Sequence, residues 1–132
     1  DYGYPSNELY SPRRSSGTLL CYNKHTINDD PYLDVGEQDI TSHVNFSALS
    51  HFGIKNGLMS CGLTNQANFL LALGFKDYLR KTLAAEAGQD MISMVKKESF
   101  LTNTLLLDMG HKFKVLIQRK GIPKKDLLGL QL

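Results

Sequence analysis

The hydrophobic pattern changes its period between residues 44 and 120, and this change limits the fold more than any other feature of the sequence. Apolar residues recur at helical spacing from Val44 to Phe52, and again within residues 65–83 and 91–105. Residues 58–63 and 112–120 instead have the length and content of strands, and in the second Phe113, Val115 and Ile117 alternate with other residues. The pattern therefore predicts a mixture of helices and short strands.

Capping and turn residues mark the ends of these elements. Asn45 is expected to cap the first helix, because its side-chain oxygen can accept an orphan backbone N–H, and Asn56-Gly57 supplies left-handed residues that end it. Thr64 or Asn65 is expected to cap the next helix, which Gly74 interrupts before it continues to Leu83. Gly88 then precedes a third amphipathic helix, and residues 108–110 form the turn out of it.

The first forty residues are less regular. Residues 5–16 are rich in Pro, Ser, Arg and Tyr, residues 26–38 contain Asn, Asp, Pro and Gly, and both segments are expected to be loops. Between them, residues 17–25 (GTLLCYNKH) form either a short strand or the first turn of a buried helix, since periodicity cannot separate the two over so few residues. Cys21 and Cys61 form no C-x-x-C pair and are expected to be buried thiols.

Length and charge exclude several classes of protein. With 132 residues and 42% apolar content, one ordinary domain is expected. The 15 basic and 13 acidic residues are spread over most of the length and give a formal charge of +2, which does not indicate a nucleic-acid partner. No apolar run approaches the roughly 20 residues needed to span a bilayer, so no membrane partner and a cytoplasmic location are expected.

The stretch DITSHVNF, residues 39–46, concentrates polar chemistry. If it is extended, Asp39, Thr41 and His43 point to one side, which suits a cleft better than a core. If it is helical, Asp39 and His43 share a face at a spacing of four, as do Cys21 and His25. No zinc-type spacing, G-x-S-x-G turn or G-x-G-x-x-G loop accompanies these residues, so neither a metal site nor a nucleotide cradle is expected.

Five segments, in this order, resemble the C-terminal half of the MidA family of S-adenosylmethionine-dependent methyltransferases. They are DYGYP (1–5), GTLLCYNKH (17–25), GEQDITSHVNFSAL (36–49), LTNQANFLLALG (63–74) and MGHKFKVLIQRKG (109–121). The chain departs from the family at Asn45, where Asp is frequent, and this exchange preserves capping. The resemblance covers the chain nearly end to end.

The resemblance implies an α/β fold, the C-terminal half of a Rossmann-like class I methyltransferase fold with a helical layer. DYG would end the fifth strand, and residues 58–63 and 112–118 would be the last two strands, paired antiparallel. Residues 1–132 are expected to be a single partial domain, a piece of something longer, whose N-terminal cofactor-binding half is absent. S-adenosylmethionine would be bound mainly by that half, and this chain alone is expected to be inactive.

The resemblance also suggests a site. Asp1, Tyr2, Gly3, Thr41 and His43 would line the substrate or cofactor pocket, although a polar ladder that fixes the loop to the sheet explains the same residues. The expected substrate is a protein arginine side chain, which needs an acidic group to orient it and take up a proton.

Asp39 is the candidate catalytic residue for that role. A non-enzymatic interaction module that uses residues 45–106 is the main alternative, and a metal-dependent hydrolase using His25, Asp39 and His43 is the third hypothesis. The role of His25 stays open, and an exposed strand edge would favour a homodimer.

Overall fold

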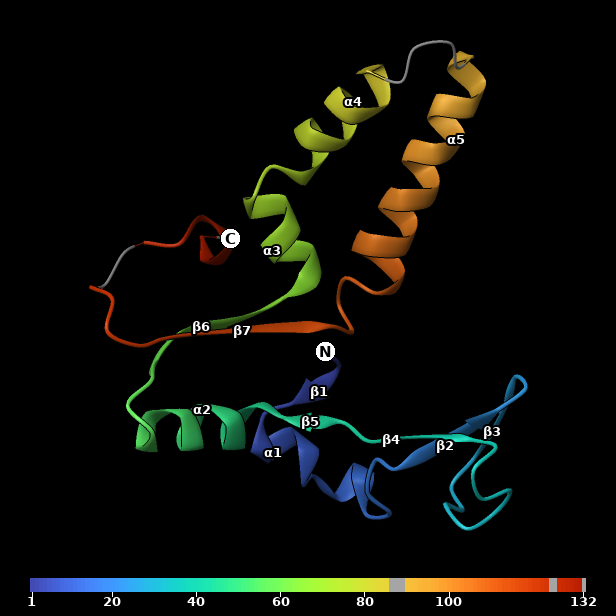
Figure 1. Ribbon diagram of the computed structural model, residues 1–132, viewed down its shortest axis with the longest axis vertical. Helices are drawn as coiled ribbons and strands as arrows, with labels where there is room; N and C mark the ends of the chain where they lie inside the picture. Colours follow the sequence, from blue (N-terminus) through green and yellow to red (C-terminus); the bar gives the residue numbers. More distant parts are fainter. Residues whose placement is uncertain (86–89, 124–125, 132) are drawn as a thin grey trace. The chain divides into compact units, whose positions relative to one another are not determined.

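The computed structural model describes residues 1–85, 90–123 and 126–131 (Figure 1). The chain divides into two compact units. One comprises residues 2–52, and the other comprises Asp1 with residues 53–132. Both contain helices and small sheets, so the mixture of helices and strands expected from the sequence is confirmed.

The first unit is organised around a parallel strand pair. Strand β1 (Gly3–Tyr4) pairs in parallel with β5 (Val44–Asn45). Helix α1 (Ser6–Leu9) and the 3-10 turn η1 (Pro12–Arg14) follow β1. Helix α2 (Phe46–Lys55) begins directly after β5. The helix thus begins directly after the expected cap, Asn45, and backbone pairing with β1 holds Val44 extended before it.

A three-stranded antiparallel sheet occupies the rest of this unit (Figure 1). Its order is β3-β2-β4, formed by β2 (Leu20–Asn23), β3 (Thr26–Asn28) and β4 (Asp39–Thr41). Residues 20–23 are thus a strand, as one of the two sequence interpretations had it. Lys24 and His25 join β2 to β3 with φ values of 45° and 71°, the two consecutive positive φ angles of a type I′ hairpin turn.

The predicted loop over residues 26–38 is therefore wrong in its first three residues. The hairpin turn directs Thr26–Asn28 back along β2, and strand pairing then holds their backbone extended. From residue 29 to residue 38 the chain is irregular, as expected.

The ends of α2 follow the sequence signals closely. Asn45 accepts a hydrogen bond from the backbone N–H of Ala48 at 2.9 Å, which confirms it as the helix cap. At the other end Gly57 has φ 79°, and the N–H of Leu58 donates to the carbonyl of Gly53 at 2.9 Å. These features are those of a Schellman motif, in which a left-handed glycine satisfies the last helical carbonyls.

The second unit contains an antiparallel pair of strands. Strand β6 (Met59–Asn65) pairs with β7 (Lys114–Arg119), so the expected final antiparallel pair is confirmed. The register shifts between Ser60 and Gly62, which leaves Cys61 as the extra residue of a bulge. Cys61 is only half-buried, so the expectation of two buried thiols holds for Cys21 and not for Cys61.

Helices follow and precede these strands. They are α3 (Gln66–Ala72), α4 (Phe75–Ala85), α5 (Met91–Thr102), the π-helical segment η2 (Asn103–Asp108) and the 3-10 turn η3 (Leu128–Leu130). Asn65 caps α3 by accepting from the N–H of Asn68 at 2.8 Å, which settles the choice between Thr64 and Asn65. Gly74, with φ 79°, separates α3 from α4 as predicted. The predicted break at Gly88 lies outside the described residues.

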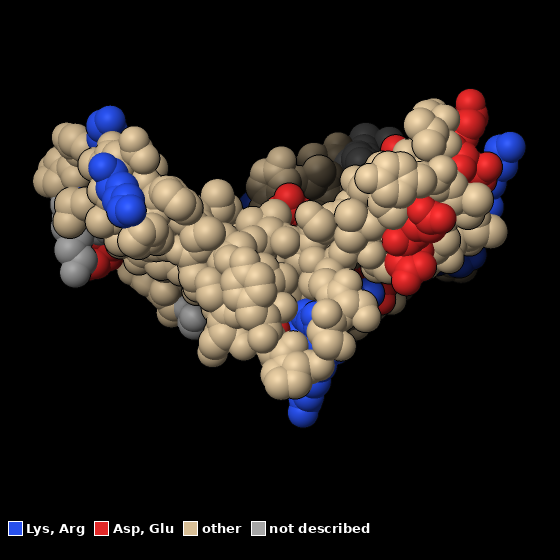
Figure 2. All heavy atoms as spheres, turned by 90° about the horizontal axis from the view of Figure 1, so that it is seen from below, with Lys and Arg blue, Asp and Glu red and all other residues tan. Residues whose placement is uncertain are grey.

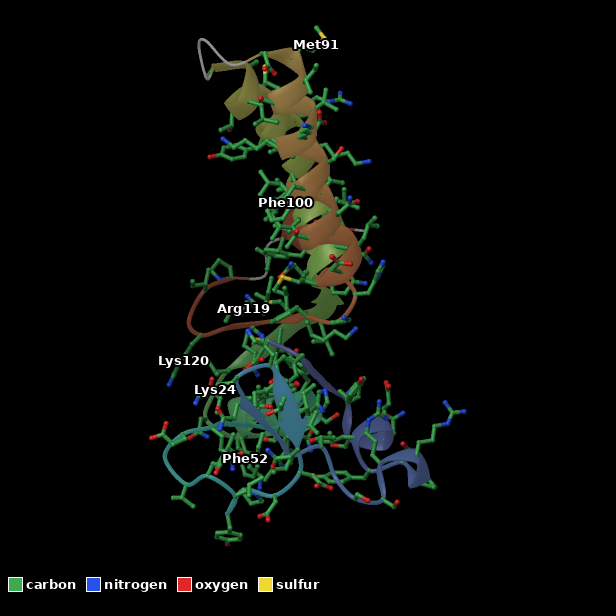
Figure 3. The ribbon with its side chains drawn as sticks, turned by 90° about the vertical axis from the view of Figure 1, so that its right-hand side faces the viewer. Lys24, Phe52, Met91, Phe100, Arg119 and Lys120 are labelled. Carbon is green, nitrogen blue, oxygen red and sulfur yellow. The ribbon has the colours of Figure 1, made fainter. Side chains whose placement is uncertain are left out.

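The buried residues are few and divide between the units. Leu9, Cys21 and Phe46 are buried in residues 2–52, and Ala67, Leu79, Leu83 and Leu106 are buried in the other unit. Helix α5 buries none of its residues, and Met91 and Phe100 are 80% and 66% exposed (Figure 3). The one-sided burial expected for β7 is also absent, since all six of its residues are half-buried.

Candidate functional site

The residues of the DITSHVNF stretch have different structural surroundings. Asp39 and Thr41 lie on β4, and His43 lies between β4 and β5. The Thr41 hydroxyl donates to the carbonyl of Leu20 at 3.2 Å, and the backbone N–H of His43 donates to the Thr18 hydroxyl at 3.1 Å. These two bonds tie the stretch to the chain around β2.

The imidazole of His43 lies between two tyrosine rings. Its ring centroid is 5.1 Å from that of Tyr2, at an interplanar angle of 81°, and also 5.1 Å from that of Tyr4, at 48°. Its Nδ1 atom is buried and has no hydrogen-bond partner among the described residues. Burial lowers the pKa of His43, and the nearby positive charge of Arg14 lowers it further. His43 is therefore a neutral imidazole at pH 7.

Arg14 completes this aromatic cluster, and sequence reasoning did not find it. Its guanidinium carbon lies 3.9 Å from the centroid of the Tyr4 ring, in the geometry of a cation–π contact. The same guanidinium forms an ion pair with the Glu8 carboxylate at 3.3 Å and donates to the Glu8 carbonyl at 3.0 Å. The sequence does place this arginine in a predicted loop with several tyrosines nearby in the chain. Composition alone, however, does not show which aromatic ring an arginine contacts.

Of the other predicted pocket residues, Gly3 has a clear structural requirement. A Cβ atom on Gly3 would lie 2.1 Å from the carbonyl oxygen of Val44. The close approach of β1 and β5 therefore requires glycine. Asp1 belongs to the other unit, where its carbonyl accepts from the backbone N–H of Lys114 at 2.7 Å and its backbone nitrogen donates to the Lys114 carbonyl at 3.1 Å.

Asp39 lines an open depression of about 400 Å³ at the end of the three-stranded sheet. Tyr22, Lys24 and Glu37 line it with Asp39. The structure thus places the carboxylate beside an aromatic ring and a second carboxylate. His25 lies in the adjacent hairpin turn.

Acidification should destabilise the unit that contains His43. Because the folded-state pKa of His43 lies below its ordinary value, the unfolded chain binds the proton first, and stability falls as the pH drops below about 6.5. Denaturant unfolding at pH 7.5 and pH 5 should show a lower midpoint at pH 5. The His43→Gln variant should lose part of this difference, and an identical pH dependence in that variant would contradict the assignment.

Neither a metal cluster nor a membrane span is found in the described part of the chain. Within residues 1–85, 90–123 and 126–131, no group of three or more His, Cys, Asp or Glu residues could hold a metal ion. No helix in these same ranges has the length and apolar content needed to cross a membrane.

Comparison with known proteins indicates the class of enzyme that this chain resembles. Residues 1–64 match the model of a family described as "Putative S-adenosyl-L-methionine-dependent methyltransferase". A crystal structure of a "likely methyl transferase" from Burkholderia thailandensis, bound to S-adenosyl-homocysteine, is 35% identical over 99% of this chain, with a TM-score of 0.83. A second crystal structure, of an uncharacterized protein from the same organism, is 35% identical over 99% of this chain, with a TM-score of 0.84.

These findings support a relationship between this chain and a family of S-adenosylmethionine-dependent methyltransferases. The chain spans about one third of the two solved proteins, 33% and 34% of their lengths. No curated protein shows significant similarity to it.

Proposed function

We propose that this chain forms part of an S-adenosylmethionine-dependent methyltransferase of the MidA type that modifies an arginine side chain of a protein. The observation that carries this proposal is the similarity, over 99% of the chain, to a structure bound to S-adenosyl-homocysteine. That molecule is what remains of the cofactor after methyl transfer.

The residues present fit the acceptor side of such a reaction better than the cofactor side. The sequence has no glycine-rich loop that could approach a nucleoside. It does have a carboxylate, Asp39, beside an aromatic ring in an open depression. We therefore assign most cofactor contacts to segments outside this chain, in a Rossmann-like fold of which residues 1–132 are a part.

Asp39 is the residue that we assign to the acceptor. When bound, S-adenosylmethionine supplies the methyl group. A guanidinium N–H can donate to the Asp39 carboxylate, which holds the attacking nitrogen in one orientation and receives its proton as the new N–C bond forms. Tyr2 and His43 pack against each other, and we propose that their rings form an apolar wall of the pocket in the complete site.

Methyl transfer from labelled S-adenosylmethionine tests this proposal. The full-length protein should transfer the label to a peptide that contains arginine. It should not label the same peptide when citrulline replaces the arginine. Asp39→Asn should lower the rate by about 100-fold or more, as expected when a positioned proton acceptor is removed. Asp77→Asn, a matched exchange on exposed α4, should leave the rate unchanged. Equal rates in both variants would remove Asp39 from the mechanism, and no transfer to any arginine peptide would refute the substrate class.

A non-enzymatic interaction module is the second candidate. It is favoured by the apolar residues that α5 exposes, Met91, Ile92, Val95 and Phe100. Absence of both cofactor binding and methyl transfer in the encoded polypeptide would favour this candidate over the first.

A further inference from the structure

Charge is segregated within the unit formed by residues 2–52. Residues 26–54 contain five of the 13 acidic residues of the chain and none of its 15 basic residues. The five are Asp29, Asp30, Asp34, Glu37 and Asp39. Figure 2 shows several carboxylates together on the right of the view, with Lys and Arg side chains beside them. Residues 26–54 therefore carry five formal negative charges, although the whole chain has a formal charge of +2.

One face of the three-stranded sheet carries exposed apolar side chains. Tyr22 pairs with Ile27 on one side and with Asp39 on the other, and directly paired residues of antiparallel strands point to the same face. Tyr22 is 39% exposed and Ile27 is 61% exposed. Cys21, which points to the opposite face, is fully buried. Tyr22 and Ile27 are therefore accessible on their face of the sheet.

Two carboxylates beside this face are available to a ligand. Glu37 and Asp39 line the same depression as Tyr22, and the side-chain carboxylate of neither residue forms a hydrogen bond or an ion pair with any described residue. Asp34 and Asp30 differ, since Asp34 accepts from the Asn23 amide at 3.4 Å and Asp30 accepts from the Tyr32 backbone at 2.9 Å. Lys24 also lines the depression and opposes the binding of a cation there.

We propose that one surface, here named the docking face, binds an arginine-containing basic segment of the protein substrate. The docking face consists of Tyr22, Ile27, Glu37 and Asp39. The proposal rests on the proposed function and names how its substrate is held. A guanidinium can donate two parallel N–H bonds to one carboxylate while its plane stacks on the Tyr22 ring. Ile27 accommodates an apolar neighbour of that arginine. Charge complementarity then gives the carboxylate-rich segment its preference for basic chains.

Binding of a labelled peptide to the full chain tests this without any cofactor. The probe is a fluorescein-labelled peptide with two arginines flanking a leucine, and matched peptides carry citrulline or lysine in place of arginine. Fluorescence anisotropy at low salt should show binding of the arginine peptide, at least fivefold tighter than the lysine peptide. The citrulline peptide should not bind, and added salt should weaken binding of the arginine peptide.

Variants then locate the site. The double variant Glu37→Gln/Asp39→Asn should weaken binding of the arginine peptide about tenfold or more. Lys24→Gln should strengthen it by about twofold. Asp77→Asn in the other unit serves as the matched control and should bind as the parent chain does. Circular dichroism spectra should coincide for all four proteins, since each exchange is on the surface.

The outcomes separate this inference from the proposed function. Equal binding by the double variant and the Asp77→Asn control would overturn the docking face, even if methyl transfer is observed. Equal affinity for the arginine and lysine peptides would overturn the assignment to arginine. Tight, arginine-dependent binding that the double variant loses would support the docking face, even in a protein that transfers no methyl group.

Discussion

Replacing Gly3 with alanine should lower the free energy of unfolding of the unit at residues 2–52 by about 3 kcal/mol. The new Cβ atom would lie 2.1 Å from the carbonyl oxygen of Val44 and 2.7 Å from its nitrogen, and both are backbone atoms that cannot move aside alone. The parallel pairing of β1 with β5 would have to separate. Denaturant unfolding followed by tyrosine fluorescence measures this, because five of the six tyrosines lie in this unit.

A second glycine of the same unit provides the control. Gly17 has φ 81°, and a Cβ atom there would meet nothing within 4 Å. Gly17→Ala should therefore lower stability only by the strain of a left-handed alanine, about 1 kcal/mol. If the two variants lose equal stability, the clash with Val44 is not the dominant effect. Gly3→Ala should also shift the NMR resonances of the His43 ring, because separation of the strands removes Tyr2 and Tyr4 from it.

Elements specified by local chemistry could be predicted from the sequence. Asn45 and Asn65 cap helices through bonds to N–H groups three residues later, and Gly57 ends α2 through its own backbone angle. Each of these interactions is complete within a few residues. The antiparallel pairing of β6 with β7 was also predicted, although it joins distant segments, because the resemblance to a known family supplied it.

Strand β3 shows where local reading failed. Its three residues, Thr26-Ile27-Asn28, lead directly into Asp29, Asp30 and Pro31, so composition favoured a loop. The strand exists because the turn at Lys24 and His25 returns the chain along β2, and the paired backbone then holds it extended. The β-branched Thr26 and Ile27 favour an extended backbone, but so short a segment indicates a strand only once its partner is known.

The surroundings of His43 could not be read from the sequence for a similar reason. Its ring partners, Tyr2 and Tyr4, lie about forty residues away, and they reach it only because β1 and β5 pair in parallel. Asp39 was selected from its neighbours in the sequence, but its proximity to Tyr22 depends on the register of β2 with β4. The sequence supplied the candidate residues, and which side chains lie beside them depends on the sheet topology.

Replacing Phe46 with alanine should have the largest effect on stability, about 4 kcal/mol. Phe46 is the first residue of α2 and is 5% exposed, in a unit whose buried apolar residues are otherwise Leu9 and Cys21. Removing the ring takes away a large share of the apolar surface that this small core buries, and it leaves a cavity that such short elements fill only by moving. Denaturant unfolding at pH 7.5 should show a much lower midpoint.

Phe52 is the matched control, because it lies on the same helix and carries the same side chain, but it is 59% exposed (Figure 3). Phe52→Ala should change stability by less than about 1 kcal/mol, since a half-exposed ring loses little burial and alanine favours the helix. A loss at Phe52 as large as that at Phe46 would mean that both rings are covered in solution. The exposed face of α2 would then be part of an interface, and unfolding midpoints should rise with protein concentration.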